Sequence, residues 1–88
     1  MSNSVRFKKD GINYVFDNEG NLAYSGEKDI KAVLYGCYVM GEDGSLGLYD
    51  KNFNVVIPPK YNTITAYCDN VWIAETNDDI HIYNGSNL

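Results

Sequence analysis

The amino-acid sequence predicts an all-β fold built from a repeated unit. Apolar and aromatic runs recur about every 33 residues, and short polar turns, two of them Asp-Gly, lie between these runs. No stretch carries the long apolar stripe that a pair of repeat helices needs. We therefore expect a repeating antiparallel meander of about eight short strands, arranged as a twisted sheet or a partly closed barrel.

The repeat is clearest in a four-residue strand motif. Tyr14-Val15-Phe16-Asp17 recurs as Gly47-Leu48-Tyr49-Asp50 and again as His81-Ile82-Tyr83-Asn84, with offsets of 33 and then 34 residues. Repetition of this kind predicts equivalent units that lie side by side. We interpret the chain as a single domain, 1–88, made of degenerate β-repeats at about 4–37, 38–70 and 71–84.

Each unit reads as an apolar run, a tight turn, a second run, a polar turn and a third run. Asp10-Gly11 and Asp43-Gly44 favour tight hairpins, because glycine adopts positive φ and aspartate bonds its own backbone. Asn77-Asp78-Asp79 takes the same place in the last unit. The strands expected from these signals span residues 4–8, 12–16, 21–25, 34–41, 45–50, 53–57, 70–76 and 80–84.

Two segments, 26–33 and 58–66, join one unit to the next, and we expect both to be crossing connections. Pro58 and Pro59 lack backbone donors and should end the preceding strand at Ile57. Glu27 and Lys31 stand at i and i+4, which favours a single turn of helix in the first connection.

Residues 44–64 contain Gly47, Asp50 and the run Ile57-Pro58-Pro59-Lys60-Tyr61 in an order that resembles the WG repeat, a bacterial β-rich family. That family carries a tryptophan before the glycine, where this chain has Leu46; the flanking units have Asn13 and Ile80 there. The resemblance implies a β-repeat module that serves as an interaction surface and is not tied to one activity.

The charge is acidic and unevenly spread. The net charge is −5, and residues 61–88 contain Asp69, Glu75, Asp78 and Asp79 with no lysine or arginine. This distribution disfavours direct nucleic-acid binding, which needs clustered basic residues. It favours docking on a basic partner, for example a protein that handles nucleic acid.

Residues for such an interface are predicted from the phase of the repeat. The turns between first and second strands should lie on one side, where their carboxylates gather, and large aromatic residues near the junctions are candidates for contact. The candidate interface consists of Tyr35, Glu42, Asp43, Tyr67, Trp72, Asp78 and Asp79. For the aromatic members, a role in the core is the competing interpretation.

The sequence offers little for catalysis. His81 is the only histidine and lies within an expected strand, and Cys37 and Cys68 form no metal-ligand spacing, so we interpret them as free thiols. We expect no cofactor, no metal and no enzymatic activity. The start of the chain shows no apolar segment suited to a signal peptide or membrane span, which favours the cytoplasm of a bacterium or phage-infected cell.

These features lead to one functional hypothesis and two alternatives. The hypothesis is a small acidic protein-binding module, such as a phage-encoded anti-defence or anti-CRISPR inhibitor or an immunity protein, that docks on a larger macromolecule. The first alternative is a sensor that binds a small molecule or nucleotide. The second is a structural homo-oligomer formed through exposed strands.

Overall fold

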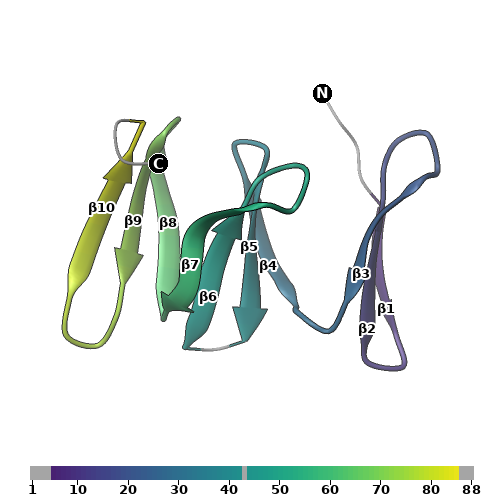
Figure 1. Ribbon diagram of the computed structural model, residues 1–88, viewed down its shortest axis with the longest axis horizontal. Helices are drawn as coiled ribbons and strands as arrows, with labels where there is room; N and C mark the ends of the chain where they lie inside the picture. Colours follow the sequence, from purple (N-terminus) through teal and green to yellow (C-terminus); the bar gives the residue numbers. More distant parts are fainter. Residues whose placement is uncertain (1–4, 43, 86–88) are drawn as a thin grey trace.

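The computed structural model describes residues 5–42 and 44–85, and within these residues it contains ten strands in three antiparallel sheets (Figure 1). The N-terminal sheet contains β1 (Val5–Lys9), β2 (Ile12–Phe16) and β3 (Leu22–Gly26). The middle sheet contains β4 (Ile30–Leu34), β5 (Cys37–Glu42), β6 (Ser45–Tyr49) and β7 (Val55–Tyr61). The C-terminal sheet contains β8 (Thr63–Cys68), β9 (Val71–Glu75) and β10 (Ile80–Asn84).

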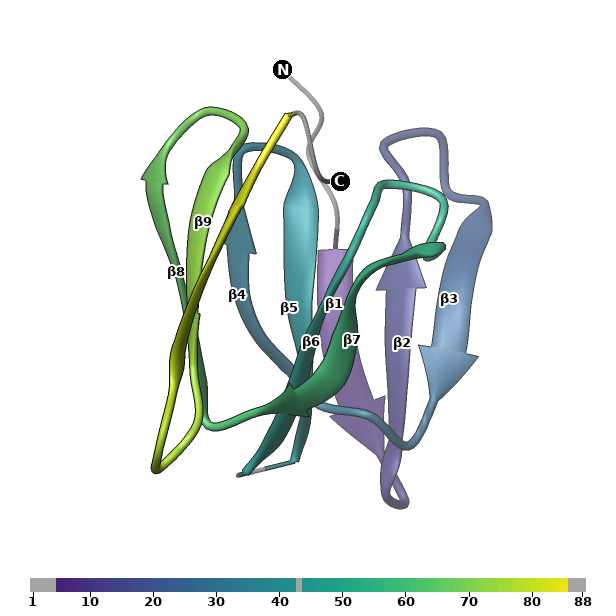
Figure 2. The ribbon, with the colours of Figure 1, turned by 60° about the vertical axis from the view of Figure 1, so that its left-hand side comes forward.

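The three sheets follow one another along the longest dimension of the molecule, whose principal extents are 38 × 28 × 16 Å. Each sheet is a meander in which strands that are consecutive in the chain pair with each other. Figure 2 shows the middle sheet between the other two, and among the strands that the structure describes no sheet closes into a barrel. The prediction of an all-β antiparallel meander is confirmed, in its twisted-sheet form.

The strand register reproduces the repeat. In the N-terminal sheet Val5 pairs with Phe16, in the middle sheet Tyr38 pairs with Tyr49, and in the C-terminal sheet Trp72 pairs with Tyr83. These pairs are separated by the same 33 and 34 residues as the sequence motif. The three hairpins therefore place equivalent residues opposite one another.

The structure has two strands more than expected, and both lie in the segments predicted to be connections. β4 pairs with β5, and β8 pairs with β9, so each adds a strand before the first strand of a repeat. The prediction of a helical turn in 26–33 is wrong, and the physical reason lies in residues 30–34. Ile30, Ala32 and Leu34 alternate with exposed positions, which is the period of a half-buried strand.

The prediction that the prolines end the strand at Ile57 is also wrong, because β7 continues through them to Tyr61. Ile57 pairs with Leu48 and Tyr61 with Leu46, so four steps along β7 face two along β6. Pro58 and Pro59 therefore lie in an irregularity of an edge strand, where a missing backbone donor interrupts no regular ladder bond.

The main core lies between the middle and C-terminal sheets. Its side chains come from one face of β5, β6 and β7 and from the facing side of β8 and β9, and β6 lies against β8. The buried members are Val39, Leu46, Leu48, Ile57, Tyr61, Ile64, Trp72 and Ala74. The opposite face of the middle sheet is also covered, since Met40 and Tyr49 are buried there.

Gly47 is required where the backbone of β7 passes close to β6. A Cβ atom at this position would lie 2.9 Å from the carbonyl oxygen of Ile57 and 3.0 Å from the Cα of Pro59. Both neighbours are backbone atoms and cannot rotate away as a side chain would. The glycine and the proline-containing irregularity thus form one packing arrangement.

The polar turns Asp17–Asn21 and Asp50–Asn54 have the same construction. The Oδ1 atom of Asp17 accepts hydrogen bonds from the amides of Glu19 and Asn21, both at 2.9 Å. The Oδ1 atom of Asp50 accepts the equivalent bonds from Asn52 and Asn54, at 2.8 and 2.9 Å. These bonds hold the turns that join the second strand to the third in two units.

We predict that Gly47→Ala destabilises the protein by about 1–3 kcal/mol, because the new methyl group overlaps fixed backbone atoms. Chemical denaturation measures the change. Gly85→Ala is the matched control, since a Cβ there meets nothing closer than 4.0 Å. A Gly47→Ala protein as stable as the control would contradict the close approach of β7.

Candidate functional site

The turns that join the first and second strands of each unit lie at the same end of the molecule, the lower end in Figure 1. We call this the hairpin end; it carries the β1–β2, β5–β6 and β9–β10 turns. Glu42, Asp78 and Asp79 are exposed there, at the β5–β6 and β9–β10 turns. Asp43 lies outside the described residues.

The aromatic candidates do not join this end. Tyr35 follows β4 and Tyr67 lies near the end of β8, so both are at the upper end in Figure 1, where they are 60% and 75% exposed. Trp72 is only 3% exposed and packs in the core, which corrects its placement on an exposed surface. Its ring contacts Tyr35 edge-on, with centroids 6.3 Å apart.

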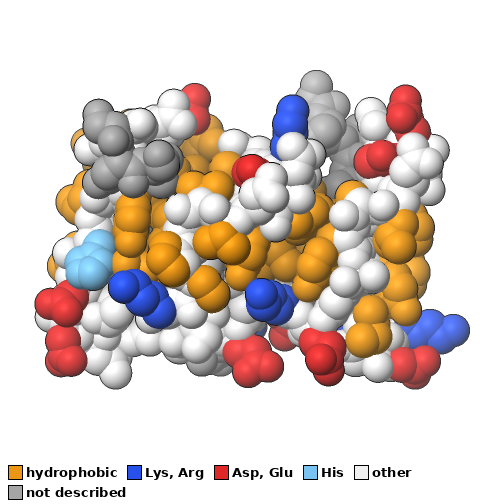
Figure 3. Space-filling model, viewed as in Figure 1, with side chains coloured by type: hydrophobic (Ala, Val, Ile, Leu, Met, Phe, Trp, Pro, Cys, Tyr) orange, Lys and Arg blue, Asp and Glu red, His pale blue; other side chains and the backbone are white. Residues whose placement is uncertain are grey.

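The hairpin end also carries charges that the sequence reasoning missed. Acidic side chains gather along the lower edge of the molecule in Figure 3, with basic side chains between and above them. A groove of about 370 Å³ is lined there by Glu27, Lys28, Gly41, Glu42, Ser45 and Pro59. Glu27 and Lys28 lie in the β3–β4 connection. Because successive strands alternate in direction, this connection lies at the same end as the hairpin turns, and that alternation could have predicted where these two residues lie.

The contact between the N-terminal and middle sheets is formed partly by an aromatic stack. The ring of Phe53 lies between those of Tyr24 and Tyr38, with centroid distances of 4.8 and 4.7 Å. Phe53 has φ of +63°, and the equivalent residue of the first unit is Gly20, with φ of +88°. An aromatic residue thus takes a backbone conformation that favours glycine, and its ring gains two stacking partners.

Beside this stack lies a cleft of about 300 Å³ between the two sheets. Its walls are Tyr24, Glu27, Lys28, Met40, Tyr49 and Phe53. The Nζ atom of Lys28 donates a hydrogen bond to the hydroxyl of Tyr49 at 3.2 Å. The cleft therefore combines apolar walls with one cation and one carboxylate.

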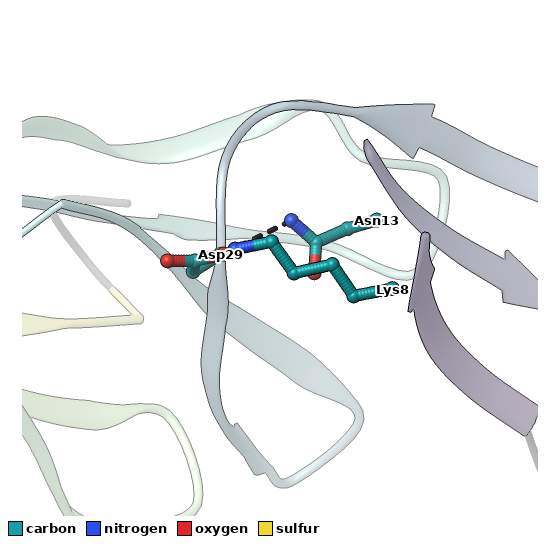
Figure 4. Close-up of polar contacts among 3 residues, drawn as sticks. All are labelled: Lys8, Asn13 and Asp29. Atoms are coloured by element: carbon teal, nitrogen blue, oxygen red, sulfur yellow. Dashed lines mark hydrogen bonds and ion pairs between the residues drawn. The ribbon is translucent and has the colours of Figure 1, made fainter. Parts of the chain in front are cut away.

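A polar cluster closes the same contact between sheets (Figure 4). The Oδ1 atom of Asp29 accepts hydrogen bonds from the side chains of Asn13, at 3.0 Å, and Lys8, at 3.1 Å. Lys8 and Asn13 pair across β1 and β2, whereas Asp29 precedes β4. The bond from Asn13, together with the bond and charge of Lys8, lowers the pKa of Asp29.

His81 takes part in a second polar cluster, at the edge of the main core. Its Nδ1 atom lies 2.7 Å from the hydroxyl of Tyr61, which lies 2.6 Å from the hydroxyl of Tyr83. Burial, followed by the bond to Tyr83, raises the pKa of Tyr61 to about 12. Tyr61 therefore keeps its proton at neutral pH, and these hydrogen bonds fix ring positions in the core.

The two cysteines are the remaining residues with reactive side chains. Cys37 and Cys68 are free thiols, and burial raises the pKa of Cys37, which opposes formation of its thiolate. Among residues 5–42 and 44–85 no group of three or more His, Cys, Asp or Glu side chains is placed to hold a metal ion. Likewise, no helix in these residues is long and apolar enough to cross a membrane.

Three carboxylates predict how stability depends on pH. A hydrogen bond from the backbone amide of Asn21 is the main cause that lowers the pKa of Asp17, and the amide of Asn54 does the same for Asp50. The side chains of Asn13 and Lys8 lower the pKa of Asp29. The unfolded chain binds protons more readily at these groups, so their stabilising effect is present above the ordinary pKa of 3.8 and is lost as the pH falls through the lowered values.

We therefore expect the melting temperature to decline on acidification below about pH 4. The triple variant Asp17→Asn, Asp29→Asn, Asp50→Asn should melt lower at neutral pH and decline less in acid, as followed by circular dichroism. A decline as steep as that of the original chain would show that other groups control acid stability.

No protein family, curated protein or solved structure matches this chain.

Proposed function

We propose that the chain is a non-enzymatic protein-binding module whose hairpin end docks on a basic surface of a larger protein. The observation that carries this proposal is that the β1–β2, β5–β6 and β9–β10 turns, one from each sheet, lie at the same end of the molecule. Turns held by antiparallel ladders present their side chains at fixed spacing, which suits recognition of a partner surface.

Charge supports this choice of partner. Asp78 and Asp79 are exposed at the β9–β10 turn, within the third of the chain that has no lysine or arginine. Glu42 adds an exposed carboxylate from the neighbouring sheet. Clustered carboxylates accelerate encounter with a basic surface and repel nucleic acid, so a protein that itself handles nucleic acid fits this chemistry.

The small size and the acidic charge are also typical of inhibitors and immunity proteins, which act by covering a surface of a larger macromolecule. This class fits a chain whose polar clusters hold structure together. The hydroxyl of Tyr61 and the carboxylate of Asp29 are both engaged in bonds that tie strands or sheets to each other.

We expect charge reversal at Asp78 and Asp79 to weaken partner binding by at least about fivefold and to flatten its salt dependence. Affinity capture from the native host identifies the partner, and calorimetry at two salt concentrations then measures its affinity for each variant. The matched control reverses Glu19 and Asp69, which are exposed at the opposite end of the molecule and change the net charge equally. Equal loss in both variants would exclude docking through the hairpin end.

The cleft beside Phe53 favours a second candidate function, binding of a small planar anion. Aromatic walls would stack on such a ligand while Lys28 pairs with its charge. A thermal-shift screen of nucleotides and aromatic carboxylates should then find a stabilising compound, and Lys28→Met should abolish the shift. A screen without any shift at millimolar ligand would remove this candidate.

A further inference from the structure

The two contacts between sheets inside the molecule follow one rule. Residues that pair directly across an antiparallel ladder place their side chains on the same face. We call the face of each sheet that carries Trp72 and Tyr83, or their repeat equivalents, its leading face. The opposite face, which carries Val39 and Leu48 or their equivalents, is the trailing face.

In both internal contacts a trailing face meets the leading face of the next sheet. Val39 and Leu48, on the trailing face of the middle sheet, pack in one cluster with Trp72, on the leading face of the C-terminal sheet. Tyr24, on the trailing face of the N-terminal sheet, stacks on Phe53, which also stacks on Tyr38 of the next leading face.

This rule leaves one face of each kind exposed at the ends of the stack. The leading face of the N-terminal sheet carries Val5 and Phe7, 62% and 48% exposed, and Phe7 stacks on Tyr14 and Phe16 at 5.1 and 5.9 Å. The trailing face of the C-terminal sheet carries Ile73, Ile80 and Ile82, and Ile80 is 65% exposed.

The exposed faces match each other by repeat position. Ile73, Ile80 and Ile82 are the equivalents of Val39, Leu46 and Leu48, the aliphatic side chains that share the core cluster with Trp72. Val5, Phe7 and Phe16 are the equivalents of Trp72 and Ala74, which belong to the same cluster, and of Tyr83, which packs against it. Each end of the molecule therefore presents the equivalents of part of this contact, without counterparts of Ile57, Tyr61 and Ile64.

One charged strand residue borders each of the two exposed faces, and these two residues have opposite charges. Lys9 borders the leading face of the N-terminal sheet, where it pairs with Ile12, and Glu75 borders the trailing face of the C-terminal sheet, where it pairs with Ile80. Contact between two copies of the same face would bring like charges together, whereas contact between the different faces brings lysine to glutamate.

We propose that the protein associates head to tail, with the leading face of one copy's N-terminal sheet on the trailing face of another copy's C-terminal sheet. The association continues the stacking of sheets found inside each molecule. Because the two faces differ, the contact is heterologous and builds open chains or rings. It uses the outer faces of the two terminal sheets and neither the cleft nor the carboxylates of Asp78 and Asp79, so it is independent of the proposed function.

Sedimentation velocity from about 10 µM to about 1 mM tests the proposal, a range that covers weak association. We expect the average mass of the original chain to rise at least about twofold over this range. Phe7→Glu and Ile80→Glu should each remain monomeric. An equimolar mixture of the two should form a dimer and grow no further, because each variant keeps one intact face.

Val55→Glu is the matched control, since it places the same charge at an exposed apolar residue of the middle sheet and should associate like the original chain. Val5→Glu and Ile82→Glu serve as second variants if either first choice unfolds, and circular dichroism checks this. The Asp78, Asp79 charge-reversal variant should also self-associate normally, which separates this contact from docking of another protein.

A chain that stays monomeric at the highest concentration would overturn the proposal. So would association that survives both end-face variants, because the contact would then lie elsewhere, for example along the edges of β1 and β10. A mixture of the two variants that stays monomeric would also overturn it, since a heterologous contact requires their complementation.

Discussion

The middle sheet must be covered on both of its faces, and the rest of the structure depends on this constraint. Along β5 and β6 apolar side chains point to both sides, so that Leu48 is buried against the C-terminal sheet while Met40 and Tyr49 are buried on the opposite face. A strand with this pattern is stable only between two layers. The repeat supplies these layers, one hairpin before the middle unit and one after it.

Different kinds of interaction hold the N-terminal and C-terminal sheets to the middle sheet. Toward the C-terminal sheet the contact is a cluster of aliphatic and aromatic side chains, and burial of each large one contributes about 1.5–3 kcal/mol. Toward the N-terminal sheet fewer side chains are buried, namely Val15, Met40 and Tyr49, and these lie beside the stack around Phe53 and the polar cluster of Asp29. Stacked pairs and partly exposed ion pairs contribute less than an apolar core does.

Local signals in the sequence were enough to predict the strand type, the hairpin turns and the repeat phase. Glycine and aspartate at the turns and the strand motif that starts at Tyr14 and recurs in altered form at Gly47 and His81 act within a few residues, so they can be recognised without a partner strand. β4 and β8 could not be recognised in this way, because Ile30–Leu34 and Thr63–Cys68 are ordered by pairing with β5 and β9. The continuation of β7 past Pro58 likewise depends on the space that Gly47 leaves.

The candidate interface was predictable only in part, for a related reason. The phase of the repeat places Glu42, Asp78 and Asp79 at one end, and strand directions alone fix that result. Burial of Trp72 depends on the facing sheet, which no local pattern describes.

The unequal attachment of the outer sheets implies a hierarchy of opening motions. Separation of the N-terminal sheet would break the contact between the rings of Tyr24 and Phe53 and would expose Val15, Met40 and Tyr49, whereas Phe53 and Tyr38 would stay stacked within the middle unit. Separation of the C-terminal sheet would expose the main core. Amide hydrogens of β1–β3 should therefore exchange through sub-global fluctuations that leave β5–β9 folded, making the N-terminal sheet a distinct cooperative unit within so short a chain.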